Sequence, residues 1–325
     1  MKIWQITAPG TVSLCESKET AGEGFLKVKL ERAAISSLDI DYFTGAEGVR
    51  YPFTPVRLGM GIVSENPDEE GSAQRGNRVV IEPYLETEDG ATLTMGKNTD
   101  GLLRDFVCVP EGNVHLLPDH VSDDEAVLTD LAAIALAAFG KLQLEKGEHI
   151  AIVGATAIGI ILAEIAIYYQ AVPILIDHRQ DMLDIATESG VYYTINTSEV
   201  DAFKKITEIT GGRLCEAAAY ISTAGDKAQK SIDFSSPQGR VVFIGAGNIQ
   251  NTLTVSLQSV ASKGITVMGV NSGEGFTARA INMLANKAID VSPLITRIVE
   301  FKEIPEVMKQ MAESPMMNII INVKI

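Results

Sequence analysis

Cysteine is scarce in this sequence, and its scarcity excludes several classes of protein. The three cysteines, Cys15, Cys108 and Cys215, are odd in number and lie far apart along the chain. Neither a disulfide framework nor a zinc-binding spacing can be built from them. Such cysteine usage is typical of the reducing cytosol, so we expect a cytoplasmic protein.

Positive charge is also in short supply. Lysine and arginine number 27 against 42 acidic residues, which gives a formal net charge of −15, and no cluster of basic residues stands out. An acidic surface repels phosphate backbones. We therefore expect no nucleic acid among the partners of this protein.

Long apolar runs are nearly absent as well. The first ten residues lack a charged segment followed by an apolar core, so they do not predict a signal peptide. Residues 150–169 are apolar enough to raise the question of a membrane span, but they contain Gly154, Gly159 and Glu164 and start with β-forming residues. A buried strand that leads into a buried helix explains this run better, and we expect no membrane contact.

The residues that are present divide the chain by pattern. Residues 1–120 contain short stretches rich in valine, isoleucine and phenylalanine between dense turn signals, which predicts strands such as 25–30, 79–82 and 106–109. Residues 123–139 carry apolar side chains at helical spacing, and Ser122 with Glu125 predicts a capping box at the start of that helix.

From residue 148 onward, strands and helices alternate, which indicates a parallel sheet covered by helices. The expected strands are 149–153, 173–177, 217–222, 240–244 and 265–270, with helices over 158–169 and 180–189. In the tail, the sequence predicts helices at 277–287 and 305–312 and strands at 299–301 and 318–323.

The sharpest motif spans residues 150–159, where a strand ends in a glycine turn that opens a helix. The N-terminus of such a helix can bind a pyrophosphate. The next strand ends at Asp177, and an acidic residue at this distance accepts the adenosine ribose hydroxyls. Its carboxylate would repel a 2′-phosphate, so we expect NAD rather than NADP, although Arg179 could soften that repulsion.

Thr156 departs from the dinucleotide-binding pattern, because it stands where a second glycine usually lets the backbone approach the pyrophosphate. A degraded cofactor site on a doubly wound sheet is the alternative interpretation. If the site is intact, we expect NAD to contact Gly154, Thr156, Ala157, Ile158, Gly159, Asp177, His178, Arg179, Ser222, Ile244, Gly245 and Val270.

Four further segments, in order along nearly the whole chain, carry a family resemblance. They are residues 78–83 (RVVIEP), 101–110 (GLLRDFVCVP), 238–245 (QGRVVFIG), and 289–296 (IDVSPLIT) followed by 304–308 (IPEVM). With the glycine motif, they resemble the medium-chain dehydrogenase/reductase family, and within it the polyol, sorbitol and threonine dehydrogenase-like branch.

The resemblance implies an α/β protein of two domains. A GroES-like, β-rich catalytic domain would comprise residues 1–138 and 272–325, with a doubly wound Rossmann domain, 139–271, inserted in it. The active site would lie in the cleft between the domains and take a small-molecule substrate.

The resemblance also shows what is missing. Ser36 and Met60 stand where zinc-dependent members have cysteine and histidine ligands, Gly61 replaces the adjacent glutamate, and the third ligand position falls at or beside Asp130. A hydroxyl and a thioether are poor zinc ligands. Residues 84–100 also contain none of the cysteines of a structural zinc lobe. We therefore expect no bound metal.

The family's proton relay is altered in the same stretch, with Leu38 and Asp41 at the relay positions. Without zinc, another group must stabilise charge on the substrate oxygen. The candidate catalytic residues are Ser36, Asp39, Asp41 and Tyr42, although a buried structural role is at least as good an interpretation of each.

Two functions remain open. The first is a zinc-independent oxidoreductase that transfers hydride between NAD(H) and a small alcohol or carbonyl compound. The second is a non-catalytic protein that binds a nucleotide or a partner on the dehydrogenase scaffold. In either case we expect a homodimer or homotetramer, because the apolar strand 264–270 should form an exposed sheet edge next to residues 253–260.

Overall fold

The structure is a computed structural model that describes residues 1–17, 24–68, 70–221, 228–245, 254–314 and 320–325. Contacts divide the chain into two compact units, residues 1–130 with 294–325, and residues 131–293. Residues 131–138 and 272–293, which the sequence analysis placed in the first domain, group by contacts with the second unit. The expected domain limits themselves stay a prediction.

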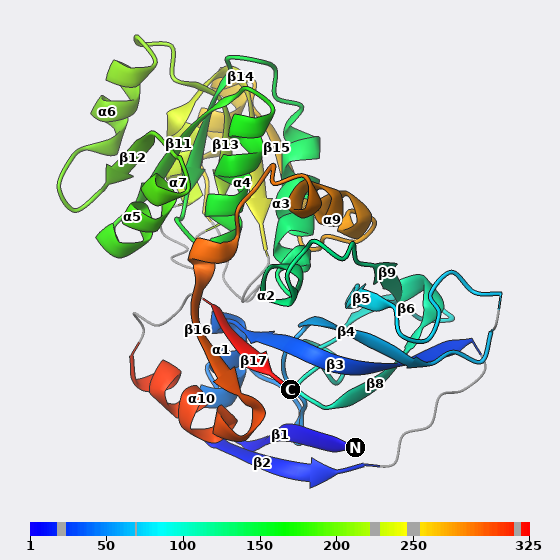
Figure 1. Cartoon of the computed structure of the whole chain (residues 1–325). Coiled ribbons are helices and arrows are strands. Elements are labelled where there is room, and N and C mark those ends of the chain that lie inside the picture. Colours follow the sequence, from blue (N-terminus) through cyan, green and yellow to red (C-terminus); the bar gives the residue numbers. More distant parts are fainter. Residues whose placement is uncertain (18–23, 69, 222–227, 246–253, 315–319) are drawn as a thin grey trace. The chain divides into compact units, whose positions relative to one another are not determined.

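The first unit is built on a seven-stranded sheet in the order β16-β17-β3-β4-β5-β9, with β8 paired to β3 (Figure 1). The bounds of its strands are β3 Phe25–Ile35, β4 Leu58–Glu65, β5 Arg78–Ile81, β8 Phe106–Pro110, β9 Val114–Leu116, β16 Ile295–Glu300 and β17 Ile320–Lys324. Two small sheets and the helices α1 Ser37–Thr44 and α10 Ile304–Glu313 also belong to it. The small sheets are β1 Lys2–Ala8 with β2 Thr11–Glu16 and β6 Tyr84–Glu86 with β7 Thr92–Thr94. The unit has its own apolar core.

The helix expected over residues 123–139 is broken in two, so that prediction was wrong in part. The structure has α2 at Asp123–Ala126 and α3 at Thr129–Leu142. The Thr129 hydroxyl donates to the Ala126 carbonyl at 2.6 Å, which turns the chain between the two helices. The predicted capping box of Ser122 and Glu125 is confirmed.

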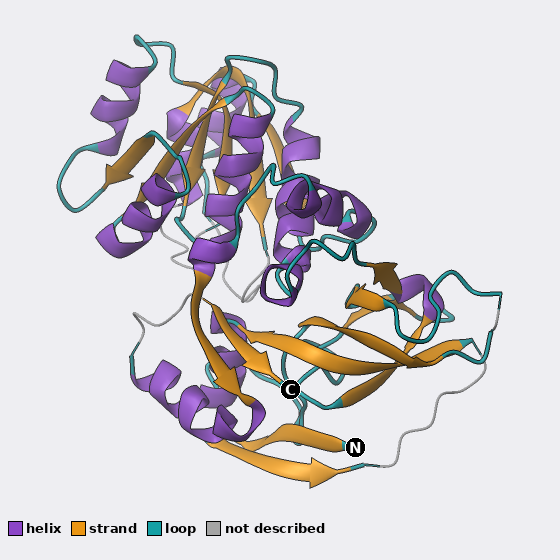
Figure 2. Ribbon diagram, viewed as in Figure 1, coloured by secondary structure: helices purple, strands orange, loops and turns teal. Residues whose placement is uncertain are grey.

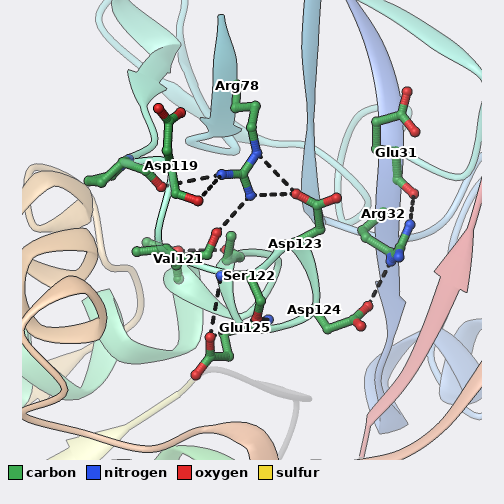
Figure 3. Close-up of polar contacts among 12 residues, drawn as sticks. Glu31, Arg32, Arg78, Asp119, Val121, Ser122, Asp123, Asp124 and Glu125 are labelled. Carbon is green, nitrogen blue, oxygen red and sulfur yellow. Dashed lines mark hydrogen bonds and ion pairs between the residues drawn. The ribbon is translucent and has the colours of Figure 1, made fainter.

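Arg78 on β5 fixes the start of α2 to the sheet. Its guanidinium donates to the carbonyl oxygens of Pro118, Asp119 and Val121 and pairs with the Asp123 carboxylate at 2.5 Å (Figure 3). One side chain thus satisfies several acceptors in the segment that leads into α3.

The second unit is a six-stranded parallel sheet in the order β12-β11-β10-β13-β14-β15. Its strands are β10 His149–Val153, β11 Val172–Asp177, β12 Tyr193–Asn196, β13 Cys215–Tyr220, β14 Ser235–Ile244 and β15 Thr266–Val270. The helices that accompany it are α4 Ala157–Tyr168, α5 Gln180–Glu188, α6 Ala202–Ile209, α7 Ala228–Phe234, α8 Leu257–Lys263 and α9 Thr277–Ala285 (Figure 2). The predicted parallel sheet is confirmed.

The apolar run at residues 150–169 proves to be β10 and α4, both largely buried within this unit. No helix among the described residues combines the length and the apolarity needed to cross a membrane. The sequence analysis missed β12 and α6, and it placed the strand β16 too far toward the C-terminus, where residues 301–303 form a single 3₁₀ turn.

Helix α4 carries one buried carboxyl group, that of Glu164, among otherwise apolar residues. The Asp290 N–H donates to Glu164 Oε2 at 2.7 Å, and the Glu164 residue is 6% exposed. Burial raises the pKa of Glu164 to about 7 from its ordinary 4.5, although the N–H of Asp290 opposes the shift. The folded state therefore holds this proton more tightly than the unfolded chain does.

This shift predicts a pH-dependent stability. The contribution of the protonated Glu164 carboxyl to the free energy of unfolding is complete below pH 4.5 and is lost as the pH rises through about 7. Glu164→Gln should therefore match the wild type near pH 4.5 and be more stable by about 3 kcal/mol at pH 9. Urea unfolding at both pH values measures the difference. Glu188→Gln, on the exposed side of α5, is the control and should change neither value. Equal stabilities of Glu164→Gln and wild type at pH 9 would contradict the assignment.

Candidate functional site

The glycine turn after β10 lies where the strand order of the parallel sheet reverses, between β10 and β13. Ligands of doubly wound sheets bind at this point, outside the carboxyl ends of the strands. Gly154 has a φ of 116°, a conformation that side chains other than hydrogen disfavour. A Cβ on Gly159 would lie 2.2 Å from the Gly154 carbonyl oxygen, so the turn and the helix approach too closely for any larger residue.

Thr156 is accommodated by this turn without strain. Its backbone is extended, with φ −83° and ψ 170°, and its hydroxyl accepts the Gly159 N–H at 3.2 Å as the N-cap of α4. The residue that departs from the glycine pattern therefore stabilises the helix start. Ala157 and Ile158 follow as the first residues of α4, where backbone N–H groups have no partner within the helix.

Asp177 connects the turn after β10 with the turn after β11 at this edge of the sheet. Its Oδ2 accepts the Ala155 N–H at 2.8 Å, and its Oδ1 accepts the N–H groups of His178 and Arg179 at 2.7 and 3.0 Å. The Arg179 side chain lies back along the turn, with Nη2 3.5 Å from the Ala155 carbonyl oxygen. The structure thus brings together the glycine turn and the acidic residue that the sequence predicted for one site.

A pocket of about 440 Å³ opens beside Asp177. Part of its lining was missed by the sequence analysis, because it comes from the unpredicted β12–α6 connection. The only sequence signal was the polar run 196–201, which ends in Asp201, the N-cap of α6. The lining residues are Val153, Gly154, Ile176, Asp177, His178, Thr197, Ser198, Glu199, Val200, Asp201, Ala202, Phe203, Lys230 and Phe234.

The remaining predicted cofactor contacts lie at the ends of the next strands. Ile244 and Val270 end β14 and β15 and are both buried, and the Gly245 N–H donates to the Val270 carbonyl at 2.8 Å. Ser222 lies outside the described residues.

The candidate catalytic residues begin helix α1 in the other unit. Asp39 is buried, and its carboxylate accepts the N–H and the hydroxyl of Ser36 at 2.8 and 2.7 Å and the N–H of Val56 at 2.8 Å. Burial raises the pKa of Asp39 above its usual range, and these hydrogen bonds oppose the rise. Ser36 and Asp39 therefore bind one another and hold the 54–57 segment in place.

Asp41 and Tyr42 have different surroundings. Burial, with Glu47 and Asp39 nearby, raises the pKa of the half-buried Asp41 carboxyl. Tyr42 is buried, with its ring edge-on to Phe53 at 5.4 Å between centroids, and burial raises the pKa of its phenol. Of the four candidates, Asp41 and Ser36 are partly exposed, whereas Asp39 and Tyr42 are buried.

The residues at the family's zinc-ligand positions do not fit a zinc ion. The Ser36 hydroxyl is bound to Asp39, and the Met60 thioether is fully buried on β4. Gly61 has no room for a side chain, because a Cβ there would lie 2.1 Å from the Lys29 carbonyl oxygen. No group of three or more histidine, cysteine, aspartate or glutamate side chains within the described ranges is arranged to hold a metal.

Asp130, at the third ligand position, has a protein cation as its partner. Its Oδ2 lies 3.2 Å from Arg57 Nε, and its Oδ1 accepts the Tyr84 hydroxyl at 2.6 Å. All three residues are buried. Burial raises the pKa of Asp130, and Arg57 and Tyr84 counter that rise. The sequence analysis missed Arg57, which has no motif of its own.

Comparison with known proteins agrees with this geometry. Residues 22–119 match the alcohol dehydrogenase GroES-like domain family, and residues 157–287 match the zinc-binding dehydrogenase family. A zinc-type alcohol dehydrogenase-like protein of Haemophilus influenzae is 28% identical over 302 residues, which cover 89% of this chain and 88% of that protein.

Solved structures share the fold over the full chain. One is a short chain alcohol dehydrogenase, RspB, of Escherichia coli in complex with NADH, with a TM-score of 0.91, 20% identity and coverage of 100% of this chain and 99% of that one. Another is a zinc-binding dehydrogenase of Sinorhizobium meliloti bound to NADP, with a TM-score of 0.90, 19% identity and the same coverage. With a GroES-like unit, a Rossmann-like parallel sheet and these relatives, the chain belongs to the medium-chain dehydrogenase/reductase family.

Proposed function

We propose that this chain is an oxidoreductase that works without zinc and transfers hydride between NAD(H) and a small alcohol or carbonyl compound. The observation that carries the proposal is the β10–α4 turn, with Asp177 bonded to it and a pocket beside it. The dehydrogenase relatives and the nicotinamide cofactors in two related structures support it.

The residues of the turn fit a dinucleotide. A bound nicotinamide cofactor supplies or accepts the hydride. The first turn of α4 would bind the pyrophosphate through backbone N–H groups and the helix dipole. Asp177 would accept the adenosine ribose hydroxyls, since it lines the pocket.

The charges of the pocket favour NAD over NADP. Asp177, Glu199 and Asp201 contribute three carboxylates to its lining, against the single ammonium group of Lys230. His178 adds an imidazole that lies 3.0 Å from Asp177. A 2′-phosphate would meet more negative than positive charge here.

For catalysis, we assign Asp41 to proton transfer and Ser36, Asp39 and Tyr42 to positioning. A raised carboxyl pKa brings Asp41 closer to the range in which it exchanges a proton near neutral pH. Ser36 and Asp39 fix the start of α1, and Tyr42 anchors the same helix in the core.

A non-catalytic role, in which the chain binds a nucleotide or a partner, is the second candidate. The observation that favours it is that the Ser36 hydroxyl, at one of the zinc-ligand positions, donates to Asp39 and is already engaged.

We also propose a homodimer or homotetramer, in a reducing cytosol, that pairs through β15. This strand ends the sheet order, and Val267 on it is 43% exposed. Leu257, on the neighbouring α8, is 80% exposed. Pairing with a second copy would satisfy the free strand edge and cover both apolar side chains. Leu253, in the expected interface segment, lies outside the described residues.

The proposed activity is tested with protein dialysed against a chelator. We expect NADH to bind, and at least one compound from a panel of small aldehydes and ketones to oxidise it, at a rate that restored zinc does not change. Gly159→Ala should abolish binding, because its Cβ has no space, whereas Gly112→Ala in the other unit should bind normally, since no atom lies within 4 Å of that position. Binding without turnover would favour the non-catalytic role, and no binding would refute the oxidoreductase.

The cofactor preference is tested at Asp177. The wild type should bind NADH more tightly than NADPH. Asp177→Asn should bind NADH about tenfold more weakly, or by about 1.4 kcal/mol, so the difference in affinity between NADH and NADPH becomes smaller. Isothermal titration with both cofactors measures this. Asp181→Asn, an exposed acid in the first turn of α5, is the matched control and should leave both affinities unchanged. Tighter binding of NADPH by the wild type would reject the assignment.

The proposed interface is tested by light scattering at micromolar concentration. The wild type should have at least twice the 34.9 kDa mass of one chain. Val267→Lys should shift the mass toward a smaller species, because lysine blocks edge pairing. Tyr192→Lys is the control, because it also replaces an uncharged side chain by a charged one. Tyr192 is 85% exposed and lies beside β12, the opposite edge strand, so this variant should keep the mass of the wild type. A monomeric wild type would contradict the proposed pairing of two copies through β15.

A further inference from the structure

One feature of the first unit is explained neither by the family pattern nor by the proposed cofactor site: a buried arginine beside the zinc-ligand positions. Arg57 is 8% exposed, and Asp130, its partner, is 4% exposed. Taking two charges out of water is costly, and their attraction offsets that cost only with good geometry and further hydrogen bonds. The Tyr84 hydroxyl donates to Asp130 Oδ1, whereas Asp130 Oδ2 lies 3.2 Å from Arg57 Nε as an ion pair without a hydrogen bond.

The backbone before Arg57 is built to turn this side chain inward. Val56 has a φ of 75°, a left-handed conformation that is strongly disfavoured for a β-branched residue. Its N–H is held by the Asp39 carboxylate at 2.8 Å, and its carbonyl accepts the Leu102 N–H at 2.6 Å. Asp39 in turn binds Ser36, so the first ligand position is linked to the segment that presents Arg57.

The guanidinium therefore contacts one of the positions that would hold a metal and acts on the residue bonded to another. It pairs directly with Asp130 at the third position, and its charge acts on Asp39, the residue bonded to Ser36 at the first. Burial lowers the pKa of Arg57, but the Asp130 carboxylate outweighs that effect and the net shift is upward, so the charge is permanent.

We propose that Arg57 takes the place of the metal ion: its guanidinium neutralises Asp130 and excludes a divalent cation from this site. The inference rests on the proposed zinc-free function and names the group responsible for it. A fixed cation 3.2 Å from Asp130 repels a second cation that approaches the same carboxylate.

The test restores the missing ligands and asks whether Arg57 still excludes the metal. Ser36→Cys/Met60→His supplies a thiolate and an imidazole in addition to Asp130, the ligand types that zinc and cobalt prefer. With Arg57 retained, this variant should bind no Co²⁺ at micromolar concentration. Adding Arg57→Leu should raise Co²⁺ affinity by about a thousandfold and give the thiolate-to-cobalt absorption band at one ion per chain.

Lys97 provides the matched control. It is a half-buried cation whose pKa is lowered by burial and by the charge of Arg57, but it does not pair with Asp130. Ser36→Cys/Met60→His/Lys97→Leu should therefore bind no more Co²⁺ than the double variant. If the leucine variant does not fold, Arg57→Gln replaces it, because glutamine keeps a neutral hydrogen-bond donor for Asp130. Circular dichroism checks the fold of each variant.

Co²⁺ binding by the double variant with Arg57 present would overturn the proposal, because the guanidinium would then not exclude a metal. Failure of the folded Arg57→Leu and Arg57→Gln triple variants to bind Co²⁺ would overturn it equally, because Arg57 would not stand in the metal's place. Neither measurement uses NADH or turnover, so failure of the proposed oxidoreductase activity is seen separately.

Discussion

Burying a carboxylate is expensive unless other groups replace its water, and this constraint shapes both units of the protein. Asp39 receives three hydrogen bonds from neighbouring residues, Asp130 receives a phenol and lies beside a guanidinium, and Glu164 receives the Asp290 N–H. At each carboxyl these contacts oppose the effect of burial without cancelling it, so the pKa of all three is raised. The contacts of Asp39 and Asp130 also hold the loop around Arg57.

The family fold is retained here while the chemistry at one of its sites has changed. In the parallel-sheet unit, Gly154, Gly159 and Asp177 keep the arrangement that a dinucleotide needs, and Thr156 fits by capping the helix. In the β-rich unit, Gly61 cannot carry even a methyl group, so the lost glutamate is not replaceable by a simple substitution. One unit thus keeps the turn of the proposed cofactor site, and the other carries a polar cluster around Arg57 at the zinc-ligand positions.

Much of this was predictable from the sequence where the signal is local. The β10–α4–β11 unit follows from a glycine turn, helical spacing and a terminal Asp177, all within thirty residues or so. The break between α2 and α3, where the Thr129 hydroxyl donates to the Ala126 carbonyl, was not predictable from helical spacing. The pairing of Arg57 with Asp130 was not predictable either, since no sequence pattern links residues so far apart. Strand β12 and the connection from β12 to α6 were missed because they are short and show too weak a periodicity.

The central claim is that the chain binds a nicotinamide dinucleotide at the α4 turn while Arg57, rather than a metal ion, neutralises Asp130. A crystal structure of the protein grown with NADH and zinc tests both parts in one measurement. The account predicts pyrophosphate density at the first turn of α4, the adenosine ribose on Asp177, and the Arg57 guanidinium against Asp130 with no anomalous zinc signal there. A zinc peak bound by Asp130, or a dinucleotide bound away from the turn, would contradict it.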